Sequence, residues 1–180
     1  MASKVGGRKA IGWRLVGWGG AVGILLLPLV AHAPWTMSDY VFAAAAFAIV
    51  GATFEMAVKR SGDRWYRCGV AVALATALLL VWINGAVGII GSEDNPANLM
   101  FLAVIAIALA GSVVARFEPR GMARAMGVAA AAQALVGMFA LAGKLGANEP
   151  PGTVGIEMLI GVFALMWLFS GWLFRRSAKQ

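Results

Sequence analysis

WINGAVGIIGSEDNPANLM, residues 82–100, decides how this chain folds. An apolar segment passes Asn84 and several glycines, reaches the acidic turn SEDNP at residues 92–96 and then returns into apolar sequence. Hydrophobic residues make up 61% of the chain and charged residues 13%, whereas ordinary soluble domains have roughly 45–50% and 25%. Because a small soluble domain cannot bury so much apolar surface, the composition indicates that lipid surrounds most of the chain.

Six apolar runs approach or reach the roughly 20 residues that a helix needs to cross a bilayer core of ~30 Å. The alternating segments of about 10 residues that membrane β-barrels require are absent from the sequence. We therefore predict an all-α, polytopic integral membrane protein, a single domain over residues 1–180 with six transmembrane helices arranged as three hairpins. The expected spans are residues 13–31, 40–58, 69–91, 99–115, 122–142 and 153–174.

The basic residues predict the orientation of these spans. They gather at both termini and in the second and fourth connections, whereas the other three connections contain only Lys144. Short loops rich in Lys and Arg stay in the cytoplasm, so we predict cytoplasmic termini in a plasma membrane of the bacterial inner-membrane type. The net charge of +7 also favours contact with anionic lipid headgroups. We expect no nucleic-acid partner, because no soluble module is present to carry a basic surface with stacking aromatics.

The first span has an alternative interpretation. Its basic start, its apolar run and the sequence AHA at residues 31–33 resemble a secretory signal with an A-x-A cleavage site. The apolar run is long for such a signal, and cleavage would leave five spans, so we predict that residues 1–33 are retained. Gly19 and Gly23 form a GxxxG pair, which is typical of close contact between membrane helices.

Two of the expected outer turns contain signals for the start of a helix. Thr36 and Asp39 fit a capping box before the second span. Asn95 before Pro96 fits an N-cap followed by proline in the first helical position. The alternative for the second turn is a cation site made from the oxygens of residues 92–98. Because Ca²⁺ takes 6–8 oxygen ligands and the turn has no EF-hand pattern, we predict capping and no metal site.

Polar side chains interrupt the apolar faces of three spans: Asn84 and Glu157 in the outer halves of the third and sixth spans, and Gln133 near the midpoint of the fifth. Asn84 shares a predicted helical face with Gly88 and Gly91, and Gln133 shares one with Met126, Ala130, Gly137 and Ala140. Such residues either bridge helices, with Lys144 as the partner of Glu157, or form a ligand or proton site, since ionisable groups inside a membrane are functional candidates. The candidate residues for ligand binding or proton exchange are Asn84, Gln133, Glu157, Glu93, Asp94 and Asn98.

Three classes of function are compatible with these observations. The sequence has no H-E-x-x-H, G-x-S-x-G or Walker motif, and with one cysteine and one histidine we predict no catalytic residue, cofactor or metal. The first class is a non-catalytic membrane subunit, scaffold or assembly factor, with lipid, other membrane subunits or further copies as partners. The second is a transporter-like or small-ligand- or ion-binding protein, and the third is an outward-facing enzyme using carboxylates as acid and base. We favour the first, because the chain is small and its loops are short.

Overall fold

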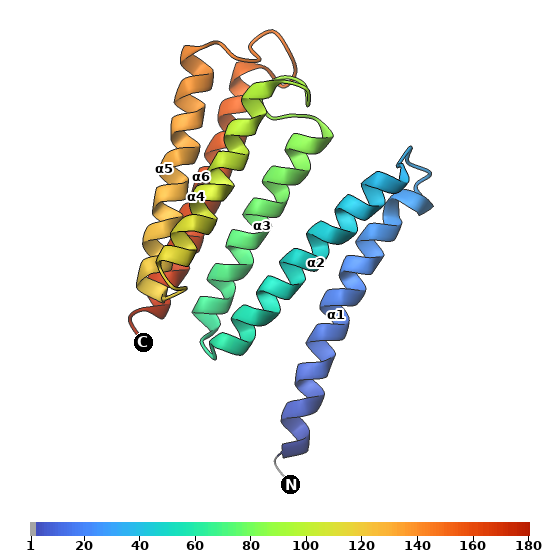
Figure 1. Cartoon of the computed structure of the whole chain (residues 1–180), viewed down its shortest axis with the longest axis vertical. Coiled ribbons are helices and arrows are strands. Elements are labelled where there is room, and N and C mark those ends of the chain that lie inside the picture. The colour runs from blue at the N-terminus through green and yellow to red at the C-terminus, as the bar shows by residue number, and fades with distance from the viewer. Residues whose placement is uncertain (1–2) are drawn as a thin grey trace. The chain divides into compact units, whose positions relative to one another are not determined.

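The computed structural model describes the backbone of residues 3–180 and the side chains of Leu15 and of residues 17–180. Over this part of the chain every regular element is helical (Figure 1). The basic residues of the first 14 positions, which entered the orientation argument, lie outside the described side chains. The helices are α1 (Ser3–Val30), α2 (Met37–Arg60), α3 (Arg64–Ala86), the 3₁₀ turn η1 (Pro96–Asn98), α4 (Leu99–Val114), α5 (Pro119–Ala142) and α6 (Gly152–Ser177).

Five of these helices are long and apolar enough to cross a membrane. They are α2, α3, α5, α6 and the stretch Pro96–Val114, which joins η1 to α4. In α1 the apolar part found among the described residues, Gly17–Val30, is shorter. The all-helical prediction is therefore confirmed, and five of the six predicted spans have the length and composition of membrane helices.

The chain divides into two compact units, Met1–Met56 and Ala57–Gln180. In the first unit, the indole Nε1 of Trp18 in α1 donates a hydrogen bond of 2.9 Å to the carboxylate of Glu55 in α2. The Trp18 ring lies over Gly51, where an added β-carbon would come within 2.6 Å of the ring. Glycine at position 51 therefore allows the large indole to pack directly on the backbone of α2.

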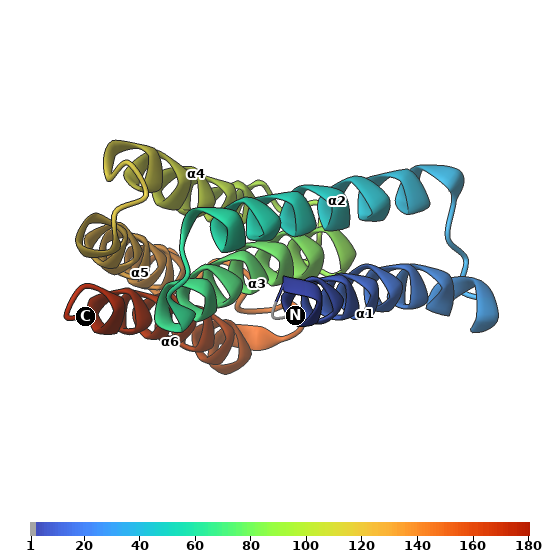
Figure 2. The same cartoon turned by 90° about the horizontal axis from the view of Figure 1, so that it is seen from below.

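In the second unit, α6 packs against both α5 and α3, and α4 packs against the other side of α5 (Figure 2). Helices α3 and α4 touch only slightly, although they follow one another in the sequence. The close approaches need small residues: Gly171 of α6 lies against the carbonyl of Ala123, and Gly69 of α3 lies against the ring of Phe174. The second predicted hairpin is thus connected in sequence, but its two helices pack mainly on α6 and α5.

The predicted third span is wrong at its C-terminal end. We expected a helix to Gly91, but α3 ends at Ala86, so Gly88 and Gly91 are not on the helical face of Asn84. Both glycines have positive φ, +72° and +69°, a conformation that glycine adopts without the strain other residues would incur. In contrast, the predicted face of α5 is confirmed, because all five of its residues are buried: Met126, Ala130, Gln133, Gly137 and Ala140.

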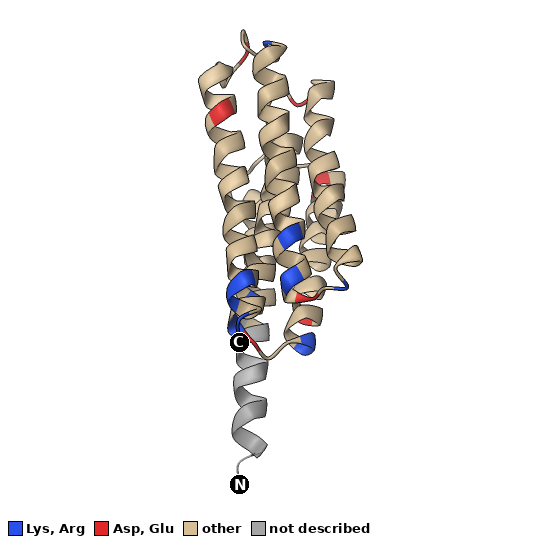
Figure 3. Cartoon of the chain, turned by 90° about the vertical axis from the view of Figure 1, so that its left-hand side faces the viewer, with Lys and Arg blue, Asp and Glu red and all other residues tan. Residues whose placement is uncertain are grey.

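The two ends of the second unit differ in charge (Figure 3). We call the end where α3 and α5 begin and α4 and α6 end the basic end; its cations include Arg64, Arg67, Arg116, Arg120, Arg124, Arg175, Arg176 and Lys179. We call the opposite end the acidic end, because its connections contain Glu93, Asp94 and Glu149 but only one basic residue, Lys144. This separation agrees with the alternation predicted from the sequence.

Asp63 joins two helices at the basic end. Its carboxylate accepts hydrogen bonds from the backbone amides of Trp65 (2.9 Å) and Tyr66 (3.3 Å), so it is the N-cap of α3. Partial desolvation raises the pKa of Asp63, but the hydrogen bonds from Ser177 of α6 and from these two amides, with the charge of Arg64, outweigh it and hold the pKa below its ordinary value of 3.8. The ionised form of Asp63 is therefore the form that stabilises the fold.

Replacing this cap should destabilise the second unit. Asp63→Ala should lower the free energy of unfolding by about 1 kcal/mol near neutral pH, the usual effect of removing an N-cap, whereas Asp63→Asn keeps an acceptor and should lose much less. Because the folded pKa is lowered, the wild-type contribution is present above 3.8 and is lost as the pH falls through the folded value. Unfolding in detergent micelles across this pH range measures both effects. Equal pH profiles for wild type and Asp63→Asn would contradict the prediction.

Candidate functional site

Asn98 holds the non-helical residues 87–95 at the acidic end. Its Oδ1 accepts hydrogen bonds from the backbone amides of Ile89 (3.1 Å) and Ile90 (2.9 Å), and its Nδ2 donates to the carbonyl of Ser92 (2.8 Å). The side chains of Ile89 and Ile90 are fully buried, and Asn98 itself is only 6% exposed. The structure therefore uses this predicted site residue to satisfy the backbone of its own loop.

The connection between α5 and α6 supports the same loop. Glu149 accepts a hydrogen bond of 2.9 Å from the backbone amide of Ser92, and an added β-carbon at Gly91 would collide with its carboxylate. At Gly146 (φ +67°) such a carbon would lie 2.7 Å from the amide nitrogen of Gly91. Sequence reasoning missed Glu149, and the glycine in each loop was the one available signal that the two backbones meet.

Both predicted caps are confirmed. Asn95 precedes η1, and its side-chain oxygen accepts a hydrogen bond of 3.0 Å from the amide of Ala97, with Pro96 as the first residue of the turn. In the first unit, Asp39 and Thr36 hydrogen-bond reciprocally before α2. The other two candidates in the acidic turn, Glu93 and Asp94, are exposed.

Gln133 and Glu157 lie in the same interface, between α5 and α6. Gln133 is 0% exposed, and neither of its amide atoms has a hydrogen-bond partner among the described residues. Glu157 lies against Gly137, one turn after Gln133, and its Oε1 is buried without a hydrogen-bond partner in the described part of the chain. Asn84 is different: its Nδ2 donates 2.8 Å to the carbonyl of Leu80 in its own helix, and its buried Oδ1 accepts no hydrogen bond from the described residues.

Trp167 of α6 is a further residue with a buried, unpartnered polar atom. Its ring is fully buried, and its Nε1 has no hydrogen-bond acceptor among the described residues. Gly137 lies against Ile160, and Gly171 lies against Met126. Sequence reasoning missed Trp167, because an apolar ring in an apolar helix gives no sign that its N–H is left without an acceptor.

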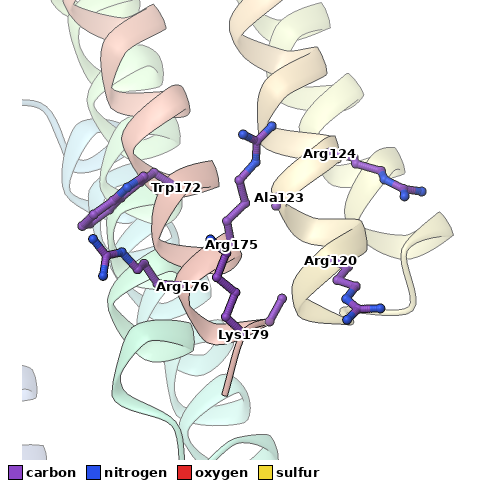
Figure 4. A pocket seen from close by; sticks show the side chains of 8 residues that line it. Arg120, Ala123, Arg124, Trp172, Arg175, Arg176 and Lys179 are labelled. Carbon is purple, nitrogen blue, oxygen red and sulfur yellow. The ribbon is translucent and has the colours of Figure 1, made fainter.

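Sequence reasoning also missed an open hollow of about 590 Å³ at the basic end, between the start of α5 and the end of α6 (Figure 4). It is lined by Arg120, Ala123, Arg124, Trp172, Arg175, Arg176, Ala178 and Lys179, with five cations and no carboxylate among them. The sequence identified these cations as an orientation signal. It did not show that the two helix ends face each other.

The fold and these features define an all-helical protein with the architecture of a multi-pass membrane protein. The sequence matches no protein-family model, and comparison with the curated proteins and with the solved structures finds no similar chain. Among the described residues, two features stand out chemically: the buried polar atoms without a hydrogen-bond partner and the cations around the hollow at the basic end.

Removing the Asn98 side chain should destabilise the second unit strongly. Asn98→Ala leaves the buried amides of Ile89 and Ile90 without acceptors, and each unsatisfied group costs about 1–3 kcal/mol. Asn98→Asp keeps the acceptor and should lose less, while Asn95→Ala, which removes one cap bond, should cost about 1 kcal/mol. Denaturant titration in micelles measures the free energy of unfolding of each variant and so ranks the three losses. A smaller loss for Asn98→Ala than for Asn95→Ala would contradict the conclusion that Asn98 holds residues 87–95.

Proposed function

We propose that this protein is a non-catalytic membrane subunit, scaffold or assembly factor whose first unit docks against another membrane helix. Its place is a plasma membrane of the bacterial inner-membrane type, with the basic end and both termini in the cytoplasm. The positive-inside rule supports this orientation, since the connections at the acidic end contain one basic residue and those at the basic end contain many. The observation that supports the docking proposal is a group of four glycines on α1 that no described side chain of the same unit covers.

We call Gly17, Gly19, Gly20 and Gly23 the glycine face of α1. At each of them an added β-carbon would meet no heavy atom of the described part of the first unit within 4 Å. At 3.6 residues per turn, Gly19, Gly20 and Gly23 project from the side of α1 away from Trp18, the residue that contacts α2. Within its own unit, the α1–α2 contact therefore leaves this face uncovered.

An uncovered glycine face has a physical cost that a partner would offset. Each glycine in a helix interior is roughly 1 kcal/mol less favourable than alanine. In lipid, small residues instead permit two helices to approach closely, which is the main way that membrane helices associate. Gly51, Gly69 and Gly171 each have a neighbour that occupies the space above the glycine. The glycine face of α1 has the same composition without such a neighbour in its unit, and this favours a partner helix.

The glycine face can be tested by adding bulk to it. Gly19→Leu/Gly23→Leu should release a partner chain that the wild type retains in mild detergent, because the leucines hold the two helix backbones apart. Native mass spectrometry of the purified material measures the stoichiometry. Val22→Phe is the matched control, since Val22 is exposed and lies on another side of the same helix.

Three results would contradict this proposal. The first is a wild-type chain that purifies as a stable monomer with no further chain. The second is a partner that the glycine variant retains as well as the wild type does. The third is a disulfide between cysteines placed on the glycine face and on the second unit of the same chain, which would assign the face to an internal contact.

A second function is favoured by the unpartnered groups in the α5–α6 interface. A transporter-like or small-ligand-binding protein would use Gln133 and Glu157 to hold a ligand or a proton, since buried polar groups normally have a hydrogen-bond partner. Against it, the described residues place Asn84 on its own helix and Asn98 in the loop. Of the six predicted candidates, only Gln133 and Glu157 lie in one helix interface with polar atoms that have no hydrogen-bond partner among the described residues.

Gln133→Met separates the two functions. If nothing binds Gln133, replacing an unsatisfied buried amide by an apolar side chain of similar shape should leave the free energy of unfolding unchanged or raise it. We expect this result, with the partner chain retained. Leu135→Met on the exposed face of α5 is the control for the chemistry of methionine. A loss of more than about 1 kcal/mol beyond the control would show that the amide has a partner, and would favour ligand binding.

A further inference from the structure

We propose that the hollow at the basic end, between the start of α5 and the end of α6, binds the headgroup of a phospholipid that carries two phosphate groups. This inference does not depend on the proposed partner subunit. It rests on the placement of five cations around one volume of about 590 Å³ and on the apolar surface that continues from it.

The cations come from two helices that face each other (Figure 4). Arg120 and Arg124 lie one turn apart on α5, Arg175 and Arg176 lie in the last turn of α6, and Lys179 follows the end of that helix. Between them the wall of the hollow is Ala123, a small and buried side chain. In Figure 4 the side chain of Arg175 lies between the two helices beside Ala123, Arg120 and Arg124 extend on the α5 side, and Arg176 lies next to Trp172 on the α6 side.

This arrangement is unfavourable for the protein alone. Like charges one helical turn apart, such as Arg120 and Arg124, repel each other, and three further cations line the same hollow. The cations of α6 lie at a helix C-terminus, where the helix dipole favours them, but Arg120 and Arg124 lie near the start of α5, where the dipole disfavours cations. A bound anion reverses both effects, because it screens the repulsion and is itself favoured at a helix N-terminus.

Nearby acidic side chains do not neutralise the hollow. Glu118 precedes α5, but it is exposed and does not line the hollow. Asp63 is bound to the amides at the start of α3 and to Ser177. Guanidinium groups match the oxygens of phosphate with two parallel hydrogen bonds, and arginines are four of the five cations here. A ligand with two phosphates would supply the negative charge that is absent from the lining of the hollow.

The surroundings of the hollow favour a lipid over a soluble anion. Trp172, in the wall of the hollow, lies 4.8 Å below the guanidinium of Arg176 and stacks on the ring of Phe169. Tryptophan is typical of the headgroup level of a membrane. Farther along α6, Phe169 and Leu165 are exposed, so acyl chains could lie on this surface while the phosphates occupy the hollow. Basic pockets between membrane helices are known to bind such headgroups.

The test measures binding of cardiolipin to the purified full-length chain in micelles by native mass spectrometry. A direct hydrogen bond to a charged group is worth at least about tenfold in affinity, so Arg120→Gln/Arg175→Gln, which removes two guanidinium groups from the lining of the hollow, should weaken binding at least about tenfold. Lys59→Gln/Arg116→Gln is the control, because it removes the same charge from residues near the same end that do not line the hollow. We expect the control to bind as the wild type does, and phosphatidylglycerol to bind more weakly than cardiolipin.

Several outcomes would overturn the proposal. Equal loss in the control variant would mean that net charge alone attracts the lipid. Inorganic pyrophosphate that displaces cardiolipin at equal concentration would assign the hollow to a soluble anion, and equal affinity for phosphatidylglycerol would remove the requirement for two phosphates. If the glutamine variant loses its helical circular dichroism, Arg120→Lys/Arg175→Lys replaces it. That variant keeps the charge without the paired guanidinium contacts, and it should bind several-fold more weakly; unchanged binding would contradict the site.

Discussion

An apolar chain that leaves the helical conformation must provide partners for its own backbone, and residues 87–95 depend on this constraint. In lipid, non-helical backbone is tolerated only where protein groups or a water-filled cavity satisfy it. Here one side chain, Asn98, accepts from two consecutive amides and donates to a carbonyl. Glu149 contributes a further acceptor from the next connection. With the segment fixed in this way, α3 and α4 separate, and α3 packs mainly on α6 while α4 packs mainly on α5.

Local chemistry explains which parts of this fold could be predicted from the sequence. The caps at Thr36 and at Asn95 involve residues two or three positions apart, so the sequence alone contains both partners. The buried face of α5 follows from helical periodicity in the same way. The end of α3 could not be predicted, because glycine is common inside membrane helices and Gly88 adopts its positive φ only in a segment that Asn98, ten positions later, holds.

The candidate site depends on contacts between residues far apart in the sequence, so less of it than of the helices could be predicted from the sequence. Glu149 and Ser92 are 57 positions apart, and the hollow joins the start of α5 to the end of α6. Which helix ends face each other is set by the packing of α6 between α3 and α5, and no local pattern encodes this arrangement. The polar residues of the apolar spans were visible in the sequence. The sequence did not show which of them form hydrogen bonds. Asn84 donates to a carbonyl of its own helix, whereas Gln133 has no hydrogen-bond partner among the described residues.

Two features of this chain are unfavourable for it in isolation. The glycine face of α1 lowers helix stability, and the cations around the hollow repel one another. Local choices that conflict with stability occur in proteins mainly where function requires them. The two features belong to different units and share no residue, so bulk added at Gly19 does not change the hollow's lining, and removal of Arg120 leaves the glycine face intact. The proposed helix docking and the proposed lipid binding therefore depend on separate parts of the chain.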